Sequence, residues 1–149
     1  SQGFPASGRS RTTLDTGRPG SWRVGMNDLE EIMLDALPGT TFIAHHKALE
    51  AAGHAIQLVT GVSAPLKVLA DQVIRSASSV PANLAEGHGR AGRDRLHHWR
   101  IAYGSAKETD SHLRLLVAAG AVDVDQADSA LQLLDEVRAM TWRLLHPKA

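Results

Sequence analysis

The sequence predicts an all-α protein: an antiparallel up-down-up-down four-helix bundle with a flexible N-terminal extension. Aromatic residues make up only 4% of the chain, and Ala and Leu dominate its apolar residues. After residue 40, apolar residues recur with the 3.6-residue period of a helix in four consecutive stretches, which glycine and proline separate. A β-sandwich would instead need alternating runs of Val, Ile, Thr and Tyr.

The chain divides into three parts by composition. Residues 1–25 are rich in Gly, Ser, Thr, Pro and Arg and have no apolar period, so we expect them to be flexible. They are more readily interpreted as an upstream extension than as a functional arm, since Met26 resembles a natural start. Residues 26–39 are expected to hold a short helix over 28–37, ended by a Pro-Gly pair, and a linker. Residues 40–149 form the predicted bundle.

The four helices of the bundle have predicted beginnings and ends. The first helix is expected to run from about Thr41, capped by Thr40 or Thr41 itself, to Thr60, and the second from about Ser63 to Gly87. The third is expected to run from about Asp94 to Gly120, and the fourth from Asp123 or Asp125 to His146. Pro65 is expected in the first turn of the second helix, where its missing N–H costs nothing. Each helix is then roughly 30–40 Å long at about 1.5 Å per residue. Short connections between helices of matched length make neighbours antiparallel.

Pro81 lies deep inside the second predicted helix. Proline there removes one backbone hydrogen bond and pushes on the carbonyl of Ala77, at about 3 kcal/mol in an ordinary helix. The apolar stripe passes Pro81 without changing phase, so we expect a kinked but continuous helix rather than a break. Asn83 and Ser78 are predicted to supply donors to the freed carbonyls.

Polar residues around this kink are expected to point inward or sideways. A buried carboxylate is costly unless it is paired, so the arginines should meet the glutamates. The predicted set is Arg75, Asn83, Glu86, Arg90, Ser105 and Glu108. We interpret it as a structural network that fixes the register of the second and third helices; a ligand site at the Pro81 kink is the alternative.

The segment from Arg75 to Arg100 is locally basic, with five arginines against Glu86 and Asp94, a net +3. Most of these arginines fall where the second helix connects to the third, at one end of the bundle. A basic rim there would bind phosphate with a salt-sensitive affinity. The candidate nucleic-acid-binding residues are Arg90, Arg93, Arg95, His97, His98 and Arg100. A solvated loop is the alternative interpretation.

Several classes of protein are not expected. The chain has no cysteine, which excludes disulfides and thiolate metal sites, and its eight histidines form no HxxxH or ExxH pair. No phosphate-binding loop, dinucleotide fingerprint or nucleophile elbow occurs. We therefore expect no enzyme, cofactor or bound metal. No apolar run reaches the length of a membrane span, so a cytoplasmic protein is expected. Trp99, Tyr103 and Trp142 could stack on bases, but core or subunit contacts are favoured.

Two motifs resemble a known family. They are LADQVIRSA at 69–77 with SVPANLAEG at 79–87 and Gly89-Arg90, and IAYGSAKE at 101–108. They resemble the bacterial "four helix bundle protein" family, which includes proteins encoded by intervening sequences in large-subunit ribosomal RNA genes. The resemblance covers 42–146 and implies an up-down bundle assembled as a ring of five subunits, a homopentamer.

A related branch of that family comprises the accessory variability determinants of diversity-generating retroelements. These are basic pentamers that bind a reverse transcriptase and RNA. The present chain departs from this branch because residues 26–149 carry a net charge of −3. The sequence thus predicts a non-enzymatic oligomeric scaffold or interaction protein. The alternative is an RNA-binding accessory protein of a reverse transcriptase that uses the basic rim.

Overall fold

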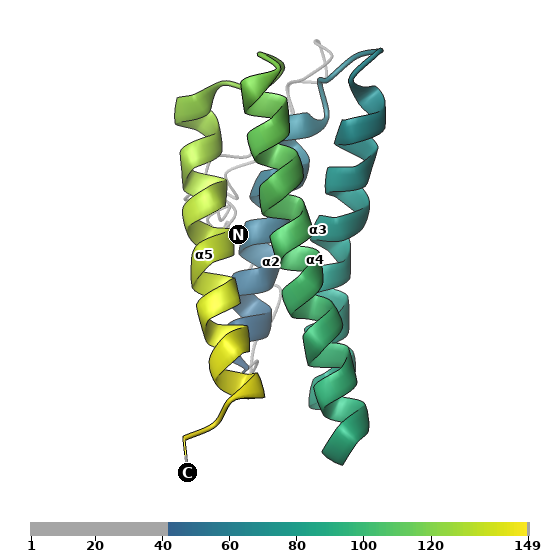
Figure 1. The fold of residues 1–149 in the computed structure, drawn as a ribbon, viewed down its shortest axis with the longest axis vertical. Helices are drawn as coiled ribbons and strands as arrows, with labels where there is room; N and C mark the ends of the chain where they lie inside the picture. The colour runs from purple at the N-terminus through teal and green to yellow at the C-terminus, as the bar shows by residue number, and fades with distance from the viewer. Residues whose placement is uncertain (1–41, 149) are drawn as a thin grey trace, which may run out of the picture.

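The computed structural model describes residues 42–148, which form four α-helices (Figure 1). They are α2 (Ile43–Val59), α3 (Lys67–His88), α4 (Gly92–Ala118) and α5 (Val124–Leu145). Each helix packs against the helix that precedes or follows it, and α2 packs against α5 to close the bundle. Neighbouring helices run antiparallel, which confirms the predicted up-down bundle. The predicted extension at 1–25 and the short helix at 28–37 lie outside the described residues.

The core is aliphatic, and its residues differ in size from helix to helix. Helix α2 contributes small side chains: Ala44, Ala48, Ala51, Ala52 and Ala55, with Val59 at its end. The large fully buried side chains, Leu84, Leu113, Leu116 and Leu134, come from the other three helices. Each buried leucine stabilises the fold by about 1.5–3 kcal/mol. An alanine face on α2 lets this helix lie close to its neighbours while their leucines fill the centre.

Two helix ends match their predicted signals. Asp123 caps α5, because its Oδ1 accepts hydrogen bonds from the N–H groups of Asp125 at 2.9 Å and Gln126 at 3.1 Å. Gly120 ends α4 with a φ of +75°, in the left-handed region. The N–H of Gly120 donates to the Val117 carbonyl, and that of Ala121 to the Leu116 carbonyl, which is the Schellman arrangement.

Other helix boundaries differ from the prediction. Helix α3 begins at Lys67 instead of Ser63, so Pro65 lies before the helix, in a turn and after a cis peptide bond. Residues 61–66 are used to reverse the chain between two antiparallel helices, which leaves none of them for a first helical turn. Helix α4 begins at Gly92, two residues earlier than predicted, and Phe42 stands at the N-cap of α2 in place of a threonine.

Helix α3 continues through Pro81, which confirms that the proline does not end it. The predicted donors serve other carbonyls, so that part of the prediction is wrong. Asn83 Nδ2 donates to the Ser79 carbonyl at 2.9 Å, and Ser78 Oγ donates to the Arg75 carbonyl at 3.0 Å. A side chain on a helix reaches the carbonyl three or four residues earlier. The carbonyl of Ala77 lies outside that range for both Asn83 and Ser78.

None of the described helices is both long enough and apolar enough to cross a membrane.

Candidate functional site

Helices α3 and α4 are tightly packed where Gly87 meets Trp99. The indole of Trp99 is buried, and its Nε1 donates to the Leu84 carbonyl at 3.4 Å. A Cβ added at Gly87 would lie 2.6 Å from Trp99 Cδ1 and Nε1, so glycine is required here. Arg95 stacks over the indole at 5.5 Å and donates to the Gly87 carbonyl, so its guanidinium caps the end of α3. This junction fixes the end of the bundle on which the predicted basic rim lies.

Some of the predicted rim residues make contacts with other residues of the chain, and the others are exposed to solvent. Arg90 forms ion pairs with Glu86 and Asp94, and the hydrogen bonds that its guanidinium donates to these carboxylates raise its pKa. Arg95 is committed to backbone carbonyls, and His98 is half-buried with its Nδ1 3.1 Å from Asn83 Oδ1. The exposed remainder, without an ion pair to any described residue, is Arg93, His97 and Arg100. The rim therefore carries less free positive charge than the sequence count indicates.

The charged members of the predicted inward-facing network point to solvent. Arg75 and Glu108 are exposed, and Glu108 lies 3.5 Å from His112 on its own helix. Arg90 does pair with Glu86, as the sequence predicts, but this pair is exposed instead of buried. The prediction that these four charged residues line the interface of α3 and α4 is wrong. Long side chains can keep their charge in water, which avoids the cost of desolvation.

Small hydroxyl groups form the network that the interface does contain. Thr109 Oγ1 is 2.8 Å from both Ser76 Oγ and the Ser105 carbonyl, and Ser105 Oγ donates to Ser79 Oγ at 2.9 Å. Asn83 Nδ2 continues the chain, at 3.0 Å from Ser79 Oγ, and Asn83 Oδ1 carries it on to His98. Of the predicted set, only Asn83 and Ser105 belong to this hydroxyl seam, which joins Ser76, Ser79, Asn83, His98, Ser105 and Thr109.

A signal for the hydroxyl seam was present in the sequence. Residues 76, 79 and 83 fall on one stripe of a helix, and residues 98, 105 and 109 fall on one stripe of the next. The hydrogen bonds of the seam that join α3 to α4 need these side chains at matching levels, so they fit one alignment of the two helices. The seam therefore fixes the register of these two helices, the role predicted for the polar set to which Asn83 and Ser105 belong.

A second polar group lies on α2. Lys47 Nζ is 3.4 Å from Glu50 and 3.6 Å from Glu136 of α5. Glu50 and His54 are both buried, and His54 Nε2 has no hydrogen-bond partner among the described residues. Burial lowers the pKa of His54, against the opposing effect of Glu50. This cluster ties α2 to α5 and leaves one imidazole that is costly to protonate.

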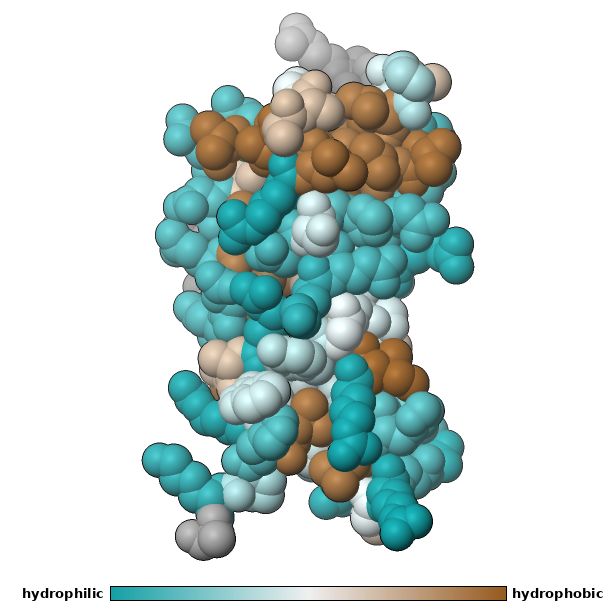
Figure 2. All heavy atoms as spheres, in the orientation of Figure 1, coloured by the Kyte–Doolittle hydropathy of each residue, from teal (hydrophilic) through white to brown (hydrophobic). Residues whose placement is uncertain are grey.

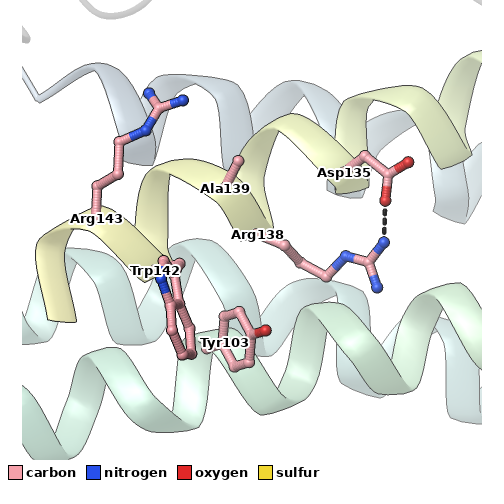
Figure 3. Close-up of a pocket in the computed structure, with 6 residues that line it drawn as sticks. All are labelled: Tyr103, Asp135, Arg138, Ala139, Trp142 and Arg143. Atoms are coloured by element: carbon pink, nitrogen blue, oxygen red, sulfur yellow. Dashed lines mark hydrogen bonds and ion pairs between the residues drawn. The ribbon is translucent and has the colours of Figure 1, made fainter. Parts of the chain in front are cut away.

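A pocket of about 390 Å³ opens between α4 and α5 (Figure 3). The rings of Tyr103 and Trp142 lie side by side at its edge, with centroids 5.9 Å apart. Arg138 extends along the other side and pairs with Asp135. Trp142 is 50% exposed, unlike the buried Trp99. Of the three aromatic residues considered for stacking, two therefore lie together at the surface.

Large hydrophobic side chains also reach solvent at the opposite end of the bundle. The exposed fractions are 67% for Val68, 49% for Leu115 and 61% for Val124. These residues lie near the start of α3, the end of α4 and the start of α5, which the up-down topology brings to one end. We call these three residues the apolar collar. Figure 2 shows a band of hydrophobic residues across this end of the face that α4 and α5 present.

Comparisons with known proteins agree on the family. The family model described as "23S rRNA-intervening sequence protein" matches residues 41–143. A solved protein of unknown function from the S23 ribosomal protein family of Bacteroides thetaiotaomicron is 25% identical, with a TM-score of 0.64. The similarity covers 69% of this chain and 98% of that one. No curated protein matches the sequence. The family match spans the whole described bundle up to the last turn of α5, and the chain belongs to the 23S rRNA-intervening sequence protein family.

Proposed function

We propose that this protein is a non-enzymatic building block that associates with further copies of itself into a homo-oligomeric scaffold. The observation that carries the proposal is the apolar collar, where Val68, Leu115 and Val124 are each about half exposed or more. Soluble monomers rarely leave large contiguous apolar patches in water, and such patches mark contact surfaces. A neighbouring subunit that covers the collar gains about 25 cal/mol for each Å² of apolar surface removed from water.

We infer a closed ring instead of a simple pair. The residues of the collar come from three helices at one end of the bundle, and in a ring they contact a different surface of the next copy. Repetition of such a head-to-tail contact closes into a ring when the rotation permits it. A homopentamer, the assembly that the family resemblance implies, is the ring that we propose.

The polar interior supports the non-enzymatic part of the proposal. Between α3 and α4, the buried polar side chains are hydroxyls bonded to one another and to helix carbonyls. Such bonds hold two helices in register. A catalytic nucleophile would instead need a base within hydrogen-bond reach.

Sedimentation velocity of the full chain tests the proposal, with two variants of matched chemistry. We expect an oligomer at micromolar concentration, dissociation by Val68→Ser, and stronger dissociation by the double substitution Leu115→Gln with Val124→Ser. Ile43→Ser is the matched control, because Ile43 has the same 67% exposure as Val68 but lies at the other end of the bundle. A monomeric wild-type chain, or an oligomer that the collar variants leave intact, would contradict the proposal.

The second candidate function is that of an RNA-binding accessory protein of a reverse transcriptase, as in the related branch of retroelement accessory proteins. The observation in its favour is that Arg93, His97 and Arg100 are exposed and follow one face of α4. Titration of a structured RNA at low and high salt tests it. Arg93→Gln with Arg100→Gln should reduce both the affinity and its salt dependence, whereas Arg90→Gln, which removes an already paired charge, should change them less. Absence of binding at low salt would exclude this role.

A further inference from the structure

The pocket between α4 and α5 has a composition that neither the core nor the collar explains. Helix α5 lines it with Asp135, Arg138, Ala139, Trp142 and Arg143, and α4 adds Tyr103. The residues of α5 recur at three- and four-residue spacing, so they form one ridge, and the short side chain of Ala139 leaves a dip in it. Two aromatic rings stand at one edge of this dip, and Arg138 stands at the other (Figure 3).

The indole of Trp142 already stacks on a planar heteroaromatic ring. The imidazole of His146 lies on it with a centroid distance of 3.7 Å and an interplanar angle of 28°. His146 comes four residues after Trp142 on α5, whereas the pocket residues Arg138 and Ala139 come before it. The imidazole and the pocket therefore lie on opposite sides of the indole along the helix axis. A planar ring that enters the pocket would meet the indole on the side away from His146, where Tyr103 stands beside it (Figure 3).

A lysine lies beside the aromatic pair. Lys107 Nζ lies 5.7 Å from the centroid of the Tyr103 ring, and Lys107 has no ion pair with a described residue. Because α4 and α5 are antiparallel, the turn of α4 with Lys107 faces the turn of α5 with Arg138. A ligand that reaches from the indole past Ala139 would thus extend toward Lys107 and toward Arg138, whose guanidinium is already paired with Asp135 and Asp110. Charge-assisted hydrogen bonds from such cations to a phosphate are short and strong, and a nucleotide carries a phosphate together with a flat ring.

We propose that this pocket binds a nucleotide. The nucleobase stacks on Trp142 beside Tyr103 and above Ala139, and the phosphate lies between Lys107 and Arg138. Stacking of a base on an aromatic side chain does not depend strongly on which base it is, so the site should accept purines and pyrimidines. The nucleotide is either free or part of a single strand, because both present the same ring and phosphate. This inference is independent of the proposed oligomer, which uses the opposite end of the bundle.

The test uses the full chain with adenosine 5′-monophosphate as the probe, followed by quenching of tryptophan fluorescence and by isothermal calorimetry. We expect saturable quenching. Trp142→Leu should weaken binding at least about fivefold, while Trp142→Phe, which keeps an aromatic face, should retain most of it. Ribose 5-phosphate should not compete, and adenosine should bind more weakly than the nucleotide. Lys107→Gln should weaken binding of the nucleotide but not of adenosine, and Lys67→Gln on α3 is the matched control.

A single-stranded RNA of ten adenosines distinguishes the two sources of the ligand. If each site of the assembly binds the strand more tightly than the mononucleotide, the natural ligand is a strand; equal affinity per site indicates a free nucleotide. Two results would overturn the proposal. One is nucleotide binding that is absent, or unchanged in both Trp142→Leu and Lys107→Gln. The other combines two observations: the wild-type chain does not bind the nucleotide, and Trp142→Leu dissociates the assembly in the ultracentrifuge. The pocket would then be a contact between copies.

Discussion

Substitution of Gly87 by alanine should destabilise the bundle, although alanine is the better helix former. The added Cβ would lie 2.6 Å from two atoms of the Trp99 indole and 3.0 Å from the Arg95 carbonyl oxygen. Neither neighbour can move aside at low cost. The indole is buried and hydrogen-bonded to the Leu84 carbonyl, and the Arg95 carbonyl belongs to the backbone of α4.

The size of the effect follows from two opposing contributions. Overpacking a tight contact costs about 1–3 kcal/mol, and a contact this short belongs at the upper end. Replacing glycine by alanine inside a helix returns about 1 kcal/mol. We therefore expect Gly87→Ala to lower the free energy of unfolding by about 2 kcal/mol. Gly104→Ala is the matched control on α4, because nothing lies within 4 Å of its added Cβ, and it should stabilise the fold.

Urea denaturation followed by circular dichroism measures both variants at one protein concentration, since the stability of an oligomer depends on concentration. The two glycine variants should differ by about 3 kcal/mol, with opposite signs relative to wild type. In a Trp99→Leu background the penalty at Gly87 should largely disappear, because the clashing ring is gone. If Gly87→Ala is as stable as Gly104→Ala, the described approach of α3 to α4 is incorrect.

Three further substitutions test other parts of the structure. Thr109→Val keeps the shape of a fully buried side chain but removes its hydroxyl from the seam, so it should lower the free energy of unfolding by about 1 kcal/mol. Thermal or urea unfolding measures this loss, and an unchanged free energy would show that the seam contributes nothing to stability. Asp123→Ala removes the side-chain cap of α5 and should also cost about 1 kcal/mol, whereas Asp123→Asn should cost much less. Burial lowers the pKa of His54, so below about pH 6.5 the unfolded chain binds a proton that the folded chain resists. Stability should therefore fall as the pH drops from 6.5, and His54→Gln should flatten that part of a curve of melting temperature against pH; an unchanged slope would exclude His54 as its source.

The fold could be predicted from the sequence because apolar periodicity and glycine or proline breaks act locally. The cap at Asp123 and the continuity of α3 through Pro81 are examples. The start of α3 could not be placed in the same way. Pro65 is acceptable both in a first helical turn and in the turn before it, and only the packing of α2 beside α3 decides between the two.

The polar interior was harder to predict than the fold. Large charged residues such as Arg75 and Glu108 attract attention in a sequence, but they can rotate toward water from the flank of a helix. Serine and threonine give a weak sequence signal because they occur in every environment. Their pairing at 2.8 Å between Thr109 and Ser76 depends on which faces of α3 and α4 meet. The pocket at Trp142 likewise depends on two helices whose residues are far apart in the chain.

The central claim is that the apolar collar holds copies of this chain together. Sedimentation equilibrium of the complete chain over a hundredfold concentration range tests it most directly. We expect an associated species about five times the mass of one chain, which Leu115→Gln with Val124→Ser converts to folded monomers of unchanged helix content. A single species with the mass of one chain at every concentration would contradict it.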